Sequence, residues 1–259
     1  MRTTMRLAVL GTGAALAVTA IGATAAQAED GGAGNITIDK VVINGGKPVV
    51  VGTTNVVSAK VSVTASDDSG IAETTYISAF GPKPNYAQIW DDEIKCVKAS
   101  ATTSTCTGTL TFDPKASVGF VGNNAAATWK LGTLVSANDS DFIHRDAATT
   151  FKVQRYSKLT VNASPEPVKK GKTITVTGKL SRANWEDNKY HGYANQSVKL
   201  QFRKKGSNTY TTVKTIKSNS TGNLKTTVTA ATDGYFRYSF AGTTTTPAVN
   251  AAGDFVDVR

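Results

Sequence analysis

Hydrophobic and polar residues alternate along most of this chain in short runs, with an apolar side chain at every second position. Clear examples are "NITIDKVVI" (35–43), "VSVTAS" (61–66), "TITVTGKL" (173–180) and "SVKLQF" (197–202). A period of two is typical of half-buried β-strands, and after residue 28 no dozen residues show the 3.6-residue period of a helix. Strands at a density of about seven per hundred residues, with turns between them, predict immunoglobulin-like sandwiches.

The alternating runs fall into two sets, separated near residue 155. "SPEPVKKGK" (164–172) contains two prolines and a Lys-Lys-Gly turn, which fits the first loop of a second sandwich. We therefore predict an all-β protein with two immunoglobulin-like β-sandwich domains in tandem, an N-terminal domain over 35–154 and a C-terminal domain over 156–259.

The first 28 residues have the pattern of a cleaved signal peptide. Arg2 and Arg6 precede an apolar stretch from Leu7 to Thr24, and Ala26-Gln27-Ala28 forms a small-x-small cleavage site. An N-terminal membrane anchor is the alternative, and the Ala-x-Ala ending favours cleavage. No later stretch is apolar for long enough to span a bilayer, so the pattern predicts a secreted, extracellular and soluble protein.

Two cysteines, Cys96 and Cys106, lie in the mature chain with nine residues between them. Outside the cytosol such a pair most simply forms one disulfide, with free thiols as the alternative. Metal ligation is disfavoured because no histidine or second cysteine pair stands nearby.

Charge is distributed unequally between the two halves. Residues 29–154 contain 10 lysines and arginines against 13 acidic residues, a net charge of −3, whereas residues 155–259 contain 17 against 6, a net charge of +11. This asymmetry indicates that the second domain attracts an anionic partner.

The basic residues concentrate in one predicted hairpin, residues 197–217. Its candidate anion-binding face comprises Lys199, Arg203, Lys204, Lys205, Lys214 and Lys217. Anionic cell-wall polymer, nucleic acid or anionic lipid would be attracted in a salt-dependent way, although few aromatic residues are placed to stack bases and no specific nucleic-acid motif is present. The alternative is a solvent-exposed face of the sheet, on which lysines preserve solubility and prevent edge strands from pairing with other chains.

The preceding loop, "NWEDNKYHGYANQ" (184–196), is rich in aromatic residues. Trp185, Tyr190 and Tyr193, with His191 among them, could form a platform on which sugar rings stack. The alternative is that these rings fold back and close one end of the sandwich.

Acidic residues of the first half are candidates for calcium, the one cofactor that we consider. They lie in three short groups, namely Asp67 and Asp68, Asp91 and Asp92, and Asp139 and Asp141. Calcium requires six to eight oxygen ligands, so two groups would have to converge at one end of the sandwich. No EF-hand loop is present, and aspartates in turns also bond nearby backbone amides.

Catalytic motifs are absent from the sequence. His144 and His191 are the two histidines and fall in different predicted domains, and neither a G-x-S-x-G elbow nor H-E-x-x-H occurs. The residues of a serine–histidine–aspartate site need to be close only in the folded protein, not in the sequence. A hydrolase is therefore kept as a less favoured alternative.

"ITIDKVVINGGKPVVVGTTN" with "VSVTASDDSGI" resembles the N-terminal domain of secreted actinobacterial proteins of unknown function, some of them labelled calcium-binding. "VTGKLSRANWEDNKYHGYANQSVKLQFRKKGSNTYTTVKTIKSNSTGN" followed by "DGYFRYSFAGT" is similar to immunoglobulin-like modules of Streptomyces exported proteins. The resemblance covers nearly all of the mature chain and implies two immunoglobulin-like sandwiches and export from a Gram-positive cell. It transfers no catalytic residue.

Together these features predict a secreted, non-catalytic binding or envelope-associated module whose partner is anionic wall polymer or an acidic protein. A calcium- or carbohydrate-binding protein is one alternative. An inhibitor or substrate of an exported enzyme is another, acting through the Cys96–Cys106 loop or "FGPKPNYAQIW" (80–90). The pattern leaves the oligomeric state open.

Overall fold

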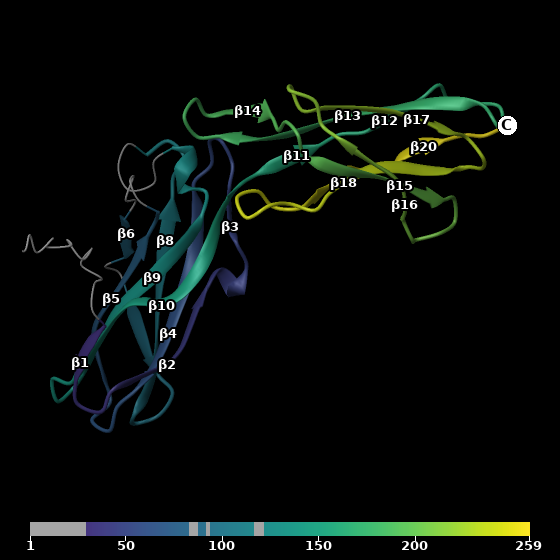
Figure 1. The fold of residues 1–259 in the computed structure, drawn as a ribbon. Coiled ribbons are helices and arrows are strands. Elements are labelled where there is room, and N and C mark those ends of the chain that lie inside the picture. The colour runs from purple at the N-terminus through teal and green to yellow at the C-terminus, as the bar shows by residue number, and fades with distance from the viewer. Residues whose placement is uncertain (1–29, 83–87, 92–93, 117–121) are drawn as a thin grey trace, which may run out of the picture.

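The structure is a computed structural model that describes residues 30–82, 88–91, 94–116 and 122–259 (Figure 1). The predicted signal peptide, part of the 80–90 segment and Asp92 lie outside these ranges. Strands make up more than half of the described residues, and the helices among them are two single 3-10 turns, η1 (Asn44–Gly46) and η2 (Asn123–Ala125). Among the described residues, no helix has the length and apolar character needed to cross a membrane.

Two sheets form the first domain. One has the strand order β2 (Thr37–Ile43), β4 (Val57–Ser66), β8 (Thr103–Phe112), β7 (Lys95–Lys98). The other has the order β1 (Gly31–Ala33), β10 (Phe142–Arg155), β9 (Thr128–Ala137), β5 (Ile71–Phe80), β6 (Gln88–Asp91), with β3 (Val49–Val51) parallel to the end of β10. This grouping is the ABED and CFG arrangement of an immunoglobulin-type sandwich.

Alternation along the strands builds the first core. In β4, Val61, Val63 and Ala65 are fully buried, while the residues between them are partly exposed on the other face. Phe112 packs edge-to-face on Trp129, with ring centroids 5.7 Å apart, and the indole of Trp129 donates a 2.7 Å hydrogen bond to the carbonyl of Ala125.

The second domain repeats this plan with a separate core. Its first sheet contains β11 (Ser157–Leu159), β12 (Asn162–Ser164), β13 (Thr173–Asn184), β14 (Lys189–Gly192) and β17 (Asn223–Thr229). Its second contains β16 (Thr211–Lys217), β15 (Ser197–Lys204), β18 (Gly234–Phe240), β19 (Val249–Asn250) and β20 (Asp254–Val256). Tyr238 is fully buried between the sheets, its hydroxyl donates to the carbonyl of Val176, and burial raises the pKa of that phenol.

The domains meet without an intervening linker (Figure 1). β10 of the first domain runs to Arg155, and β11 of the second begins two residues later, at Ser157. The amide of Tyr156 donates to the carbonyl of Val51 at 2.8 Å, and the side-chain amide of Gln154 donates to Thr243 and Thr244. Burial, with a smaller contribution from Arg182, lowers the pKa of the Arg155 guanidinium to about 10.

A hairpin of the second domain extends this junction. β13 continues beyond its own sandwich, and the β13–β14 turn reaches the first domain (Figure 1). Trp185 in that turn is only 4% exposed, joins the first domain's core, and donates through its indole nitrogen to the carbonyl of Gly52 at 2.8 Å. Asn188 adds a 3.0 Å hydrogen bond to the carbonyl of Pro114. Backbone and side-chain contacts therefore hold the two domains together.

Candidate functional site

Four cations share the outward face of the β16-β15-β18 sheet, and we call them the outer basic face. In β15, Val198 and Leu200 are buried, so Lys199 and Arg203 point outward. Directly paired residues of antiparallel strands lie on the same face. Lys217 pairs with Ser197, and Arg237 pairs with Gln201, so both join Lys199 and Arg203 there.

Aromatic rings hold the two arginines of this face in fixed positions. The guanidinium carbon of Arg237 lies 3.8 Å from the ring centroid of Tyr210, and that of Arg203 lies 4.1 Å from the centroid of Tyr235. The stack continues to Phe255, whose centroid is 5.1 Å from that of Tyr235. Cation–π contacts of this kind fix a planar guanidinium while leaving edge N–H groups for a ligand.

Hydrogen bonds complete the support of these arginines. Arg237 donates from Nε to Oε1 of Gln201 at 2.9 Å, and Arg203 donates from Nη1 to the carbonyl of Ser207. Tyr210 lies over Gly253, where an added Cβ would come within 2.3 Å of the tyrosine hydroxyl, so a side chain there would displace the Tyr210 ring. The four cations of the outer basic face have no carboxylate within 4.0 Å anywhere in the described part of the chain.

The expectation that all six hairpin cations share one face is wrong. Lys214 pairs with Leu200 and Lys204 pairs with Gly234, which puts both on the opposite side of the sheet from Lys199. Lys205 lies in the following turn and forms an ion pair with Asp233 at 3.4 Å. The sequence reasoning also missed Arg237, because that residue comes from a strand remote from the hairpin.

In the first domain, the structure brings together three of the six predicted metal candidates, Asp67, Asp139 and Asp141. One carboxylate oxygen from each lies within 4.8 Å of those of the other two, and we call these residues the acidic cluster. Asp67 follows β4, and the other two lie in the β9–β10 turn. This is the end of the domain remote from Arg155 and the second domain (Figure 1).

Of the other three metal candidates, Asp68 alone has a described side chain, and it is not part of the cluster. Asp68 accepts a 2.9 Å hydrogen bond from the side-chain amide of Asn35. Asp91 ends the edge strand β6, and its side chain, like the whole of Asp92, lies outside the described residues.

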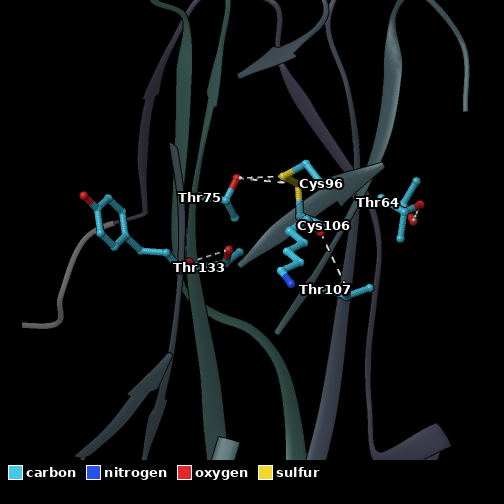
Figure 2. Close-up of a disulfide and its surroundings, with 9 residues drawn as sticks. Thr64, Thr75, Cys96, Cys106, Thr107 and Thr133 are labelled. Carbon is cyan, nitrogen blue, oxygen red and sulfur yellow. Dashed lines mark hydrogen bonds between the residues drawn. A yellow bond between two sulfur atoms is a disulfide. The ribbon is translucent and has the colours of Figure 1, made fainter. Parts of the chain in front are cut away.

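The predicted disulfide between Cys96 and Cys106 is confirmed. The two cysteines are direct partners on the neighbouring strands β7 and β8, and Cys106 is fully buried. Figure 2 shows the hydroxyl of Thr75, from the facing sheet, pointing at the sulfur atoms, and its oxygen lies 3.6 Å from the sulfur of Cys106. The bridge thus ties an edge strand to the core.

The aromatic residues proposed as a sugar platform pack against two different cores, Trp185 and Tyr190 in the first domain and Tyr193 in the second. Trp185 is buried in the domain junction, so its ring is not available for stacking on a sugar. Tyr190 is partly buried beside Tyr156 and under the amine of Lys158, and burial raises the pKa of its phenol. Tyr193 packs edge-to-face on Phe240 of the second core. The alternative, in which the rings fold back and close one end of their own sandwich, does not describe Trp185 either, because that ring packs in the core of the first domain.

Both histidines lie next to an aspartate of their own domain. His144 Nε2 is 3.1 Å from Asp146, and His191 Nε2 is 2.6 Å from Asp187. Among the described residues, no serine, threonine or cysteine forms a hydrogen bond with either imidazole ring.

No family model matches this chain, and no curated protein matches it. Among solved structures, the chain is similar to the adhesin InvE of Yersinia pseudotuberculosis, with 14% identity and a TM-score of 0.25, over 83% of this chain and 56% of that one. It is also similar to the D00-D0 domain of intimin, with 14% identity and a TM-score of 0.26, over 84% of this chain and 99% of that one. This chain therefore spans little more than half the length of the InvE chain. The fold assignment rests on the strand order described above.

Proposed function

We propose that this protein is an exported, non-catalytic binding module that attaches to an anionic polymer of the cell envelope through the outer basic face. The observation that carries the proposal is the outer basic face itself, four cations on one sheet that have no acidic partner among the described residues. That sheet belongs to the half of the chain with a net charge of +11. A surface of this kind attracts polyanions over a distance set by ionic strength.

The chemistry of the face favours phosphate-bearing polymers. Arg203 and Arg237 are held flat against tyrosine rings, and a fixed guanidinium presents paired N–H donors that match phosphate oxygens. Lys199 and Lys217 are exposed on the same face. Their flexible ammonium groups add positive charge and need no particular orientation of the ligand. The four cations are spread over three neighbouring strands of one sheet, which suits a long chain of repeating charges.

Export is supported by two features. The first 28 residues have the pattern of a signal peptide, and the Cys96–Cys106 disulfide is of the kind that persists in oxidising compartments. The first domain, with its net charge of −3, is then left to face away from the polymer or towards a second partner.

Cosedimentation with purified cell walls tests the proposal. The test variant is K199E/K217E on the outer basic face, and the control is K179E/K225E, whose exposed lysines lie on the opposite sheet of the same domain. Both variants change the net charge equally. We expect the wild type and the control to sediment with walls at low salt and to be released at high salt, and the test variant to stay in solution.

Equal loss of binding in both variants would contradict the proposed face, because bulk charge alone would then explain attachment. Binding that does not respond to salt would contradict the electrostatic mechanism.

A further inference from the structure

We propose that the acidic cluster of the first domain binds one calcium ion. Asp67 from the β4–β5 turn and Asp139 and Asp141 from the β9–β10 turn would supply its protein ligands. The site lies in the other domain from the outer basic face, so it goes beyond the proposed function and does not depend on it.

The strongest reason is a buried carboxylate oxygen of Asp67 that has no hydrogen-bond partner among the described residues. Asp67 is 4% exposed, and its Oδ1 accepts hydrogen bonds from the backbone amide and hydroxyl of Ser69, at 2.8 and 2.6 Å. Its Oδ2 is buried and has no hydrogen-bond partner in the described part of the chain. A buried carboxylate oxygen without a donor is costly, and a metal ion in the cluster supplies the missing partner.

The second reason is uncompensated charge. No lysine, arginine or histidine nitrogen of the described residues lies within 4.0 Å of the three carboxylates. Their partners are neutral donors, such as the amide of Asn35, which donates to Asp141 at 2.8 Å, and the amide of Asp141, which donates to Asp139 at 3.1 Å. Neutral donors leave the mutual repulsion of three neighbouring negative charges in place, whereas a divalent cation removes it.

The chemistry of the ligands favours calcium. All three ligands are carboxylates, the oxygen donors that hard cations prefer, and no cysteine or histidine takes part. Ligands on opposite sides of a calcium ion lie about 4.6–5.2 Å apart, because each bond measures about 2.3–2.6 Å. Oxygens that lie within 4.8 Å of one another can all reach one calcium ion, and the flexible coordination of calcium accepts ligands from two turns more readily than the near-ideal octahedron that magnesium demands.

The two turns that supply the ligands are already tied to each other. The side-chain amide of Asn138 donates to the carbonyl of Ser69 at 2.8 Å, and the backbone amide of Asp139 lies 3.2 Å from the Ser69 hydroxyl. Little reorganisation is then needed when the ion enters, and water would complete the coordination shell.

Isothermal titration calorimetry of the intact protein with CaCl2, after treatment with a chelator, tests the proposal. We expect one ion per chain, with a dissociation constant on the order of 10⁻⁴–10⁻³ M, the range of extracellular calcium modules. The variants D139N and D141N should each weaken binding about tenfold or more, since ligand charge sets affinity. The control D113N changes a carboxylate of the same domain outside the cluster and should bind like the wild type.

Thermal unfolding is a second measurement, and it also shows whether each variant folds. Calcium should raise the Tm of the wild type and D113N in a concentration-dependent way, and D139N, whose side chain is exposed, should fold but show no such rise. D67N changes the buried ligand and should lose the calcium response as well.

Two results would overturn the proposal. One is the absence of both heat and a Tm shift for the wild type up to about 10 mM CaCl2, well above the expected range. The other is calcium binding that D139N and D141N leave unchanged, which would place the ion elsewhere. Neither result bears on wall binding by the outer basic face.

Discussion

The indole of Trp185 packs among the buried residues of the first domain, although the residue follows β13 of the second. Its ring nitrogen donates to the carbonyl of Gly52, and its backbone amide donates to the side chain of Asn123 at 3.0 Å. The local sequence suggested either a sugar platform, because Asn, Asp and Gln beside aromatic rings can bond sugar hydroxyls, or rings folded back over the end of their own sandwich. No local pattern shows that a hairpin extends past its own sandwich, so the burial of Trp185 could not be predicted from the sequence.

Replacing Trp185 with alanine should destabilise the protein strongly. The change removes a large buried side chain and leaves a cavity between the domains, at an expected cost of about 3–5 kcal/mol in the free energy of unfolding. Trp185→Phe keeps most of the packing and loses the bond to Gly52, so it should cost less. Urea denaturation of the three proteins checks this, and an unaltered midpoint for Trp185→Ala would mean that the junction is not closed in solution.

At the scale of elements, the alternation of apolar and polar residues predicted the strands well. It did not predict which residues of different strands share a face of the sheet. "SVKLQF" and "TITVTGKL" lie within β15 and β13, and their aliphatic positions are buried while Phe202 is partly buried. The sharing of a face by distant residues depends on register. Lys214 and Lys217 are three positions apart in one strand, so they point to opposite sides, which the grouping of six cations overlooked.

Register also explains the acidic cluster. Pairing of β5 with β9 places Ile71 opposite Ala137, so the turns next to these two residues meet at one end of the sheet. Asp67 and Asp139 are far apart in the chain and carry no spacing signature, so the sequence alone could suggest their convergence as one possibility but could not select it.

Removing the disulfide should destabilise the protein measurably while leaving the fold intact. Cys96 and Cys106 close a short loop between paired strands, and in the chain-entropy account such a bridge contributes about 2–3 kcal/mol to the free energy of unfolding. Urea titrations of the wild type, with and without reductant, and of C96A/C106A measure the change. Identical midpoints in all three would show that the bridge does not stabilise the fold.

At the scale of the whole molecule, two sandwiches of opposite charge are joined by a junction rich in hydrogen bonds. Arg155 shows how tightly the parts are connected, since its amide donates to Thr245 at 3.0 Å and its Nε donates to the carbonyl of Ala183. The division of charge was visible in the sequence, because counting requires no coordinates. The arrangement of that charge on one sheet, and its support by Tyr210 and Tyr235, needed the pairing of strands from different parts of the chain.

The salt dependence of binding tests the central claim most directly. The association constant of the intact protein for a purified phosphate-rich wall polymer would be measured across a series of NaCl concentrations. We expect its logarithm to fall linearly with the logarithm of salt, and K199A/K217A to make that slope shallower by about two, one for each lost phosphate contact. The control K179A/K225A should keep the wild-type slope. A slope that is unchanged in K199A/K217A, or that falls equally in both variants, would contradict the assignment of binding to the outer basic face.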